Sequence, residues 1–178
     1  MPESPSPSTG QYPATWNDRR FLDLVGIEIP IIQAPMAGSA GADLVVAVSE
    51  AGGLGSLPCA MLDIEQTRTQ LQIIRQRTSR AINVNFFCHE PPQRDLSCEA
   101  AWTERLRSYY VELGLDATVQ PAGAARAPFE ESMCDLVAEF TPEVVSFHFG
   151  LPHRPLLDRV KGTGAKVIST ATCVQEAR

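Results

Sequence analysis

The sequence has few basic residues and no long apolar run, and both shortages restrict what it can bind. Its 178 residues include 15 Lys and Arg against 21 Asp and Glu, which gives a net charge of −6. Nucleic acids and anionic membranes are recognised by clustered Lys and Arg, so neither is an expected partner. No segment approaches the roughly 20 consecutive apolar residues that span a bilayer, and the N-terminus lacks a signal or transit pattern. We therefore expect a soluble protein whose ligand is a small molecule.

Several common site motifs are also missing. The five cysteines form no CxxC pair and no Cys/His set with zinc spacing, so we expect reduced thiols, a cytoplasmic protein and no metal site. The sequence contains no GxGxxG, GxxxxGK[ST] or GxSxG motif. The glycine-rich AGGLG segment precedes an expected strand instead of following one, so it is interpreted as the end of a helix.

Short apolar runs alternate with longer amphipathic segments from Phe21 onward, which is typical of repeated βα units around a parallel sheet. The pattern predicts five strands, at residues 29–34, 54–58, 81–87, 143–149 and 165–170. Helices are expected from about 43 to the glycines at 52 and 53, at 63–77, 97–113 and 129–140, and in a segment that ends at Gly162. The chain then ends just inside what should be the helix of the fifth βα unit.

The domain organisation follows from the same pattern. Residues 1–18 are rich in Pro and Ser and are predicted to be a disordered tail. Residues 19–178 are expected to form one domain, with an insertion at about 90–128 because that connection is far longer than a usual βα loop. Two α/β architectures remain open. One is a complete, doubly wound five-stranded sheet, and the other is a barrel cut short, since eight-stranded barrels typically need about 250 residues.

The segment after the first expected strand, residues 33–38, lies where α/β enzymes build their sites, at the C-terminal ends of the strands. Pro35 has a fixed φ angle and no N–H, while the small Ala37 allows a flat ligand to approach the backbone. These features suit a flavin ring. The alternative is a tight turn in which Met36 fills the core.

Asn85 is a second candidate for ligand binding. It shares one face of the third strand with Asn83, because side chains alternate along a strand with a period of two. A side-chain amide offers two donors and an acceptor, which the edge of an isoalloxazine ring or a phosphate requires. The alternative is a polar strand-end residue that bonds to neighbouring loops.

His148 is the main catalytic candidate. It lies near the C-terminal end of the otherwise apolar fourth strand, where its imidazole should emerge at the mouth of a site. Histidine titrates near neutral pH, and we expect the flanking Phe147 and Phe149 to favour the neutral imidazole that a general base requires. The alternative is a hydrogen-bonded structural histidine. His89 and His153 lie in loop-like segments and are expected to be solvated or structural.

Five segments together resemble one enzyme family, the nitronate monooxygenases, formerly called 2-nitropropane dioxygenases. In order, they are IPIIQAPMAG, EAGGLGSLP, NVNFF, VSFHFGLP and KVISTATCVQEA. The resemblance extends from about Phe21 to Arg178, and the segment with His148 is its most specific part. It implies a TIM-type (β/α) barrel that binds FMN without a covalent bond and oxidises alkyl nitronates with O2 to carbonyl compounds and nitrite.

The resemblance also implies roles for single residues. Pro35, Met36 and Ala37 would lie along the FMN ring and Asn85 would bond to it, while His148 would remove the α-proton when a neutral nitroalkane is the substrate. The family continues with a glycine-rich AGGH-type segment and strands whose loops hold the FMN phosphate, and these are missing here. We therefore expect the N-terminal half of a barrel, truncated after about five βα units. The alternatives are another FMN barrel enzyme, such as an enoyl-thioester reductase, and an inactive fragment.

Overall fold

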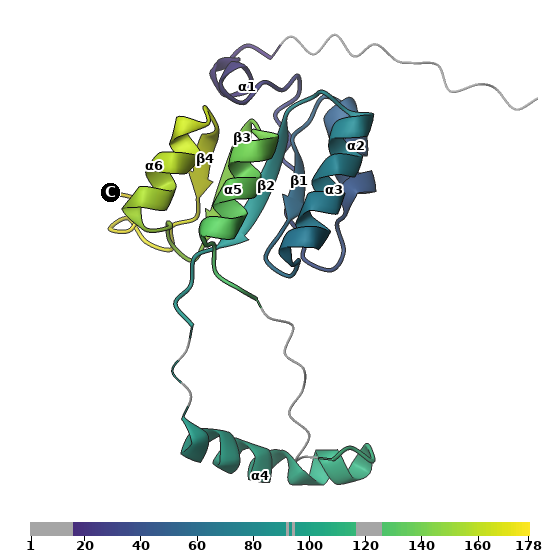
Figure 1. The fold of residues 1–178 in the computed structure, drawn as a ribbon, viewed down its shortest axis with the longest axis vertical. Coiled ribbons are helices and arrows are strands. Elements are labelled where there is room, and N and C mark those ends of the chain that lie inside the picture. Colours follow the sequence, from purple (N-terminus) through teal and green to yellow (C-terminus); the bar gives the residue numbers. More distant parts are fainter. Residues whose placement is uncertain (1–15, 92, 94, 117–125) are drawn as a thin grey trace, which may run out of the picture.

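The structure is a computed structural model that describes residues 16–91, 93, 95–116 and 126–178. It contains a parallel four-stranded sheet in the order β1-β2-β3-β4 (Figure 1). The strands are β1 (Gly55–Pro58), β2 (Ile82–Phe87), β3 (Val144–His148) and β4 (Lys166–Ser169). The helices are α1 (Arg20–Val25), α2 (Ala42–Glu50), α3 (Ile64–Arg77), α4 (Leu96–Glu112), α5 (Glu131–Phe140) and α6 (Arg154–Gly162).

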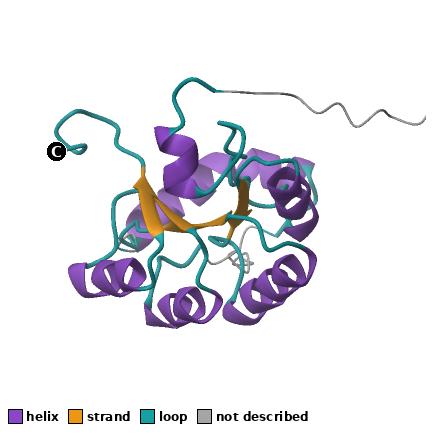
Figure 2. Ribbon diagram, turned by 90° about the horizontal axis from the view of Figure 1, so that it is seen from above, coloured by secondary structure: helices purple, strands orange, loops and turns teal. Residues whose placement is uncertain are grey.

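Helices α2, α3, α5 and α6 cover one face of the sheet (Figure 2). The alternation of side chains along each strand sends apolar residues such as Leu57, Val84 and Phe147 to this face, where they form the main core with the four helices. A doubly wound sheet would reverse its strand order and place connecting helices on both faces. The described elements do neither, so the doubly wound alternative is wrong for this part of the chain.

The opposite face of the sheet is covered at only one end. Leu22 and Val25 of α1 pack with Leu54, Val144 and, less deeply, Ile168, near the N-terminal ends of the strands. The C-terminal half of this face has no helix over it among the described elements. Polar and aromatic side chains occupy it instead, and they form the candidate site described below.

The prediction of a first strand at residues 29–34 is wrong. Only Ile32 forms a bridge, with Leu54, and the segment is otherwise irregular. Prolines near both ends of the segment remove N–H donors, which limits the ladder. The side chain of Gln33 continues the pairing: its amide donates to the carbonyl of Ser56 and accepts from the N–H of the same residue, at 3.1 Å each. This side-chain pairing attaches the 33–38 segment to β1.

The other four expected strands, and the helices expected up to Gly162, are present within a few residues of their predicted bounds. Helix α3 begins at a capping box, in which Asp63 accepts from the N–H of Gln66 and the Gln66 side chain accepts from the N–H of Asp63. The helix expected in the fifth βα unit is only a turn at residues 174–177. In the described ranges, no helix combines the length and the apolar composition needed to cross a membrane.

The predicted insertion at 90–128 and the predicted disordered tail at 1–18 fall partly outside the described residues. Within the insertion, α4 forms where a helix was expected and lies apart from the sheet (Figure 1). None of its residues is buried, so its apolar side chains, such as that of Tyr109, do not join the core, and neither does Leu113, which follows the helix. The tail is described only from Trp16 onward, and the last part of the insertion, which is rich in Pro, Gly and Ala at 121–128, only from Arg126 onward.

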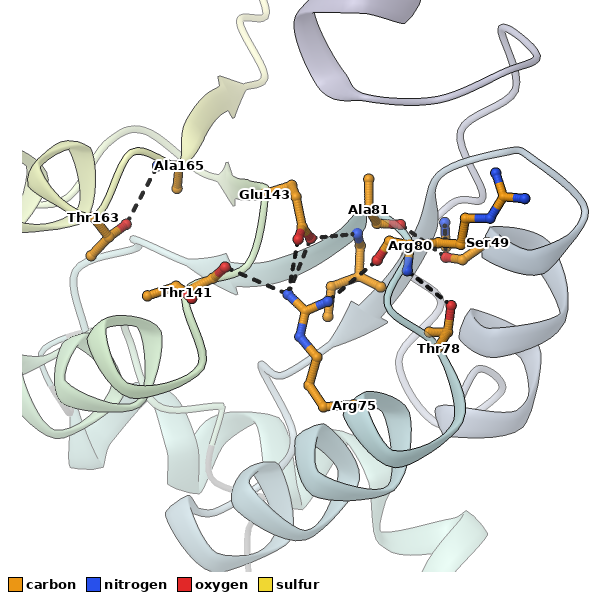
Figure 3. A network of polar contacts seen from close by, with 11 residues as sticks. Ser49, Arg75, Thr78, Arg80, Ala81, Thr141, Glu143, Thr163 and Ala165 are labelled. Carbon is orange, nitrogen blue, oxygen red and sulfur yellow. Dashed lines mark hydrogen bonds and ion pairs between the residues drawn. The ribbon is translucent and has the colours of Figure 1, made fainter.

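A polar network joins α3 to the N-terminal ends of β2 and β3 (Figure 3). The Glu143 carboxylate accepts from the N–H of Ile82 at 2.9 Å and from the Arg75 guanidinium at 3.1 Å. Arg75 also donates to the carbonyl of Arg80 at 3.3 Å. The network fixes the N-terminal edge of the sheet, opposite the edge that carries the candidate site.

Candidate active site

The candidate site lies at the C-terminal edge of the sheet. In the parallel register Phe87 is paired with His148, and Ser169 ends the neighbouring strand β4. Because parallel strands present their C-terminal ends at one edge, the residues that follow them gather there. They form a cleft of about 840 Å³, lined by His148, Phe149, Gly150, Leu151, Ser169, Thr170, Ala171, Thr172, Glu176 and Ala177.

His148 is half-buried, and the residue directly after β4 contacts its imidazole. Its Nδ1 atom lies 3.3 Å from the Thr170 hydroxyl oxygen. Thr170 is itself fixed, because its N–H donates to the carbonyl of Phe147 at 3.3 Å. The Ser169 hydroxyl donates to the carbonyl of Gly150 at 3.2 Å, so the end of β4 holds the turn on both sides of the histidine.

Two of the neighbouring phenylalanine rings, those of Phe87 and Phe149, lie near the His148 imidazole. The ring of Phe87 lies 6.0 Å from that of His148 and 4.9 Å from that of Phe149. Phe147, which was expected to flank the imidazole as well, points to the opposite face and packs in the main core 5.2 Å from Phe129. The expectation for Phe147 is wrong because adjacent residues of a strand face opposite sides of the sheet.

Of the three predicted FMN contacts in the 33–38 segment, one lines a cavity at this edge. Ala37 borders a second cavity of about 440 Å³, whose other lining residues are Met61, Phe87, His89, Arg126 and Phe149. Pro35 is half-buried and Met36 is 43% exposed, and neither borders either of the two cavities. The tight turn of the alternative is present, because the N–H groups of Ser39 and Ala40 donate to the carbonyl of Met36, but the side chain of Met36 does not fill the core. Phe149 borders both cavities and thereby connects Ala37 with the turn that carries His148.

Asn85 lies below this edge and on the same face of the sheet as Asn83, as expected. It is 1% exposed, and its amide nitrogen donates to the hydroxyl of Ser146 at 3.0 Å. The side-chain amide of Asn83 donates in the same way to the Ser56 hydroxyl at 3.0 Å. The side-chain oxygen of Asn83, Oδ1, is buried without a partner. These contacts give Asn85 a structural role between two strands, and its bond to a flavin stays a prediction.

Two residues at this edge were missed by the sequence-based prediction. His89, expected to be solvated or structural, borders the smaller cavity, and its Nδ1 atom is buried without a partner. The sequence did contain a signal for His89, because it follows the end of a strand by two residues and so lies at the edge where the site is expected. Thr170 had no such signal, because its contact with His148 depends on the register between β3 and β4.

The Cys88 thiol, which follows β2 at this edge, does not compete with His148 as a base. Burial raises the pKa of the Cys88 thiol to about 11, so the thiol stays protonated at neutral pH. Cys88 also packs against the main core, on the helix side of the sheet. Within the described part of the chain, no cluster of three or more His, Cys, Asp or Glu side chains is arranged to hold a metal ion.

The fold and the site together define an α/β protein with a parallel sheet and a candidate active site at the C-terminal edge of its strands. The comparison with known families is more specific. The family model for nitronate monooxygenase matches residues 18–178, and the chain belongs to this family.

The chain is similar to several members and solved structures over about half of their length. It is 38% identical to a nitronate monooxygenase of Pseudomonas aeruginosa over 159 residues, which cover 89% of this chain and 45% of the relative. It is 34% identical to a probable nitronate monooxygenase of Staphylococcus aureus over 167 residues, or 91% of this chain and 45% of the relative. The chain therefore spans about half the length of these relatives.

Two solved structures support the fold. Nitroalkane oxidase from Streptomyces ansochromogenes superimposes with a TM-score of 0.74 and 31% identity, covering 88% of this chain and 44% of that one. FabK from Thermotoga maritima superimposes with a TM-score of 0.62 over 89% of this chain and 39% of that one, but its 24% identity supports the fold alone.

Proposed function

We propose that this chain forms the N-terminal half of an FMN-dependent (β/α)8-barrel enzyme that oxidises alkyl nitronates with O2 to carbonyl compounds and nitrite. The unreversed strand order and the position of α2, α3, α5 and α6 on a single face are the arrangement expected of consecutive barrel units. The residues of strand β4, at one edge of the sheet, are exposed or half-buried, and Ile32, at the other edge, is 43% exposed. In a barrel, further strands would join these two edges and remove the open hydrogen-bonding groups.

The described residues fit the ring portion of FMN. The two cavities have the size of typical cofactor and ligand sites, and aromatic and small side chains dominate the lining of the smaller one. The buried, unpartnered atoms of Asn83 and His89 are polar groups that a ligand or a further segment would satisfy. Pro35, Met36 and Ala37 would lie along the ring, and Asn85 would approach its edge. When bound, FMN supplies the chemistry that accepts electrons from the nitronate and passes them to O2.

The fit does not extend to the phosphate of FMN. Arg126 is the single Lys or Arg side chain among the described residues that line the two cavities. Phosphate groups in barrel enzymes are commonly held after strands seven and eight, by backbone N–H groups at a helix N-terminus. We therefore propose that the phosphate-binding site lies in the part of the family's fold that this chain does not span.

The position of His148 is the observation that carries its proposed role as general base. Its Nδ1 atom faces the Thr170 hydroxyl, and the imidazole borders the cleft. We assign the tautomer in which Nδ1–H donates to Thr170, because Nε2 then keeps a lone pair for the substrate. The carbon next to a nitro group is acidic. Transfer of its proton to Nε2 leaves the electron pair in the nitronate, which is the form that is then oxidised.

Oxygen uptake tests the proposed function. The protein to use is this chain fused to the C-terminal part of the Pseudomonas aeruginosa relative, which we call the completed enzyme. With an alkyl nitronate we expect FMN-dependent O2 consumption together with release of nitrite. Reduction of the bound flavin by NAD(P)H at a useful rate, without nitronate turnover, would contradict the proposal and favour a reductase such as one acting on enoyl thioesters.

A further inference from the structure

Phe149 has a backbone conformation that L residues rarely adopt. Its φ angle is 64°, in the left-handed region, and among the described non-glycine residues only Thr141 shares a positive φ angle. Its side chain is 64% exposed, so burial in the core does not explain a large apolar residue at this position. A strained residue that is held in place by its surroundings, at the edge of a candidate site, points to a functional role.

The surroundings hold the Phe149 ring in a defined place. The ring packs edge-to-face on Phe87, with centroids 4.9 Å apart, and its centroid lies 6.3 Å from that of His148 and 6.4 Å from that of His89. The following residue, Gly150, has a φ angle of 100°, and its carbonyl accepts from the Ser169 hydroxyl at 3.2 Å. Strands β2 and β4 therefore both fix the turn that presents the ring.

Phe149 is also the residue shared by the two cavities. His148 lines one cavity, and Ala37, the proposed neighbour of the flavin, lines the other. A substrate that reaches both the base and the flavin must therefore lie against this ring. The nitro end of a nitronate is polar, whereas its alkyl group is apolar and would pack on an aromatic face.

We propose that the Phe149 ring is the wall that limits the size of the substrate's alkyl group, and hence a specificity-determining residue. The inference rests on the proposed function. With the ring in place, short and unbranched alkyl groups fit beside His148. Without it, the cleft of about 840 Å³ and the cavity of about 440 Å³ join into one space that admits longer or branched groups.

The test compares Phe149→Ala and Phe149→Gly with Thr141→Gly as a matched control. The control relieves the same kind of backbone strain at a φ angle of 42°, at the C-terminal end of α5 and outside both cavities. Glycine adopts positive φ without a steric cost, so Phe149→Gly and Thr141→Gly should both be at least as stable as the unmodified protein toward urea.

Substrate selectivity then separates the two positions. In the completed enzyme, we expect both Phe149 variants to shift kcat/KM about tenfold or more toward long-chain nitronates relative to short ones, and Thr141→Gly to leave the ratio unchanged. Preformed nitronates are used because their oxidation does not require a base. An unchanged ratio in folded, active Phe149 variants would overturn the proposal.

Ligand binding separates this proposal from the proposed function. Saturation-transfer NMR of the chain with nitroalkanes of increasing length ranks their affinities without turnover. A shift of that ranking toward long nitroalkanes in the Phe149 variants supports the size limit, even if the completed enzyme oxidises no nitronate. An unshifted ranking contradicts the size limit, even if nitronates are oxidised.

Discussion

Replacing His148 with Ala is expected to stop the oxidation of neutral nitroalkanes by the completed enzyme while sparing the oxidation of preformed nitronates. A positioned general base typically accelerates proton transfer about 100- to 10,000-fold, and we expect kcat/KM for the nitroalkane to fall by that amount. A nitronate has already lost the proton, so its oxidation bypasses the step. Oxygen uptake with a nitroalkane and with its nitronate, at one pH and one flavin concentration, measures the two effects separately.

Three further variants show whether the effect belongs to the imidazole and its orientation. Thr170→Val removes the hydroxyl that faces Nδ1 and should lower nitroalkane turnover about tenfold, the equivalent of one hydrogen bond. Thr170→Ser keeps a hydroxyl and should restore most of the activity. His153→Ala removes an exposed histidine outside both cavities and should change nothing. Nitroalkane turnover that survives His148→Ala would refute the assigned role.

Replacing Gly55 with Ala is expected to prevent stable folding. A β-carbon at this position would lie 2.2 Å from the carbonyl oxygen of Val45 and 2.7 Å from the hydroxyl of Ser49. The backbone of β1 passes directly against α2, where the Ser49 hydroxyl accepts from the N–H of Gly55 and donates to the carbonyl of Ala81. Relieving the contact requires the helix and the strand to separate, at a cost of about 3 kcal/mol or more.

Gly162→Ala is the matched control for this prediction. Gly162 ends α6, and a β-carbon there would meet no atom within 4 Å. Alanine should therefore raise the free energy of unfolding by about 0.5 to 1 kcal/mol, because it restricts the unfolded chain. Urea denaturation followed by circular dichroism measures both variants. A Gly55→Ala protein as stable as the unmodified one would show that β1 and α2 are not packed this closely.

Local patterns in the sequence were sufficient to predict most of the elements. The apolar alternation of β2 and β3 and the capping box at Asp63 act within a few residues, so they can be recognised without the fold. The 29–34 segment was mispredicted for the opposite reason. Its apolar residues suggest a strand, but its pairing depends on two prolines and on the contact of Gln33 with the distant Ser56.

The candidate site was predictable to a similar extent. The position of His148 follows from the end of an apolar strand, and Asn85 lies on the face that the alternation predicts. Their partners, Thr170 and Ser146, come from neighbouring strands. The register between strands that are far apart in the sequence decides these contacts, and no local pattern encodes it. The same limit concealed the shared position of Phe149 between two cavities.

We propose that this chain supplies the part of the flavin site that binds the ring, and that the rest of the family's fold supplies the phosphate-binding site. Flavin absorbance after gel filtration tests it most directly, in the chain alone and in the completed enzyme, each first incubated with FMN. We predict that the completed enzyme retains stoichiometric FMN and that the chain alone loses it. A completed enzyme that melts cooperatively but retains no flavin would contradict the account.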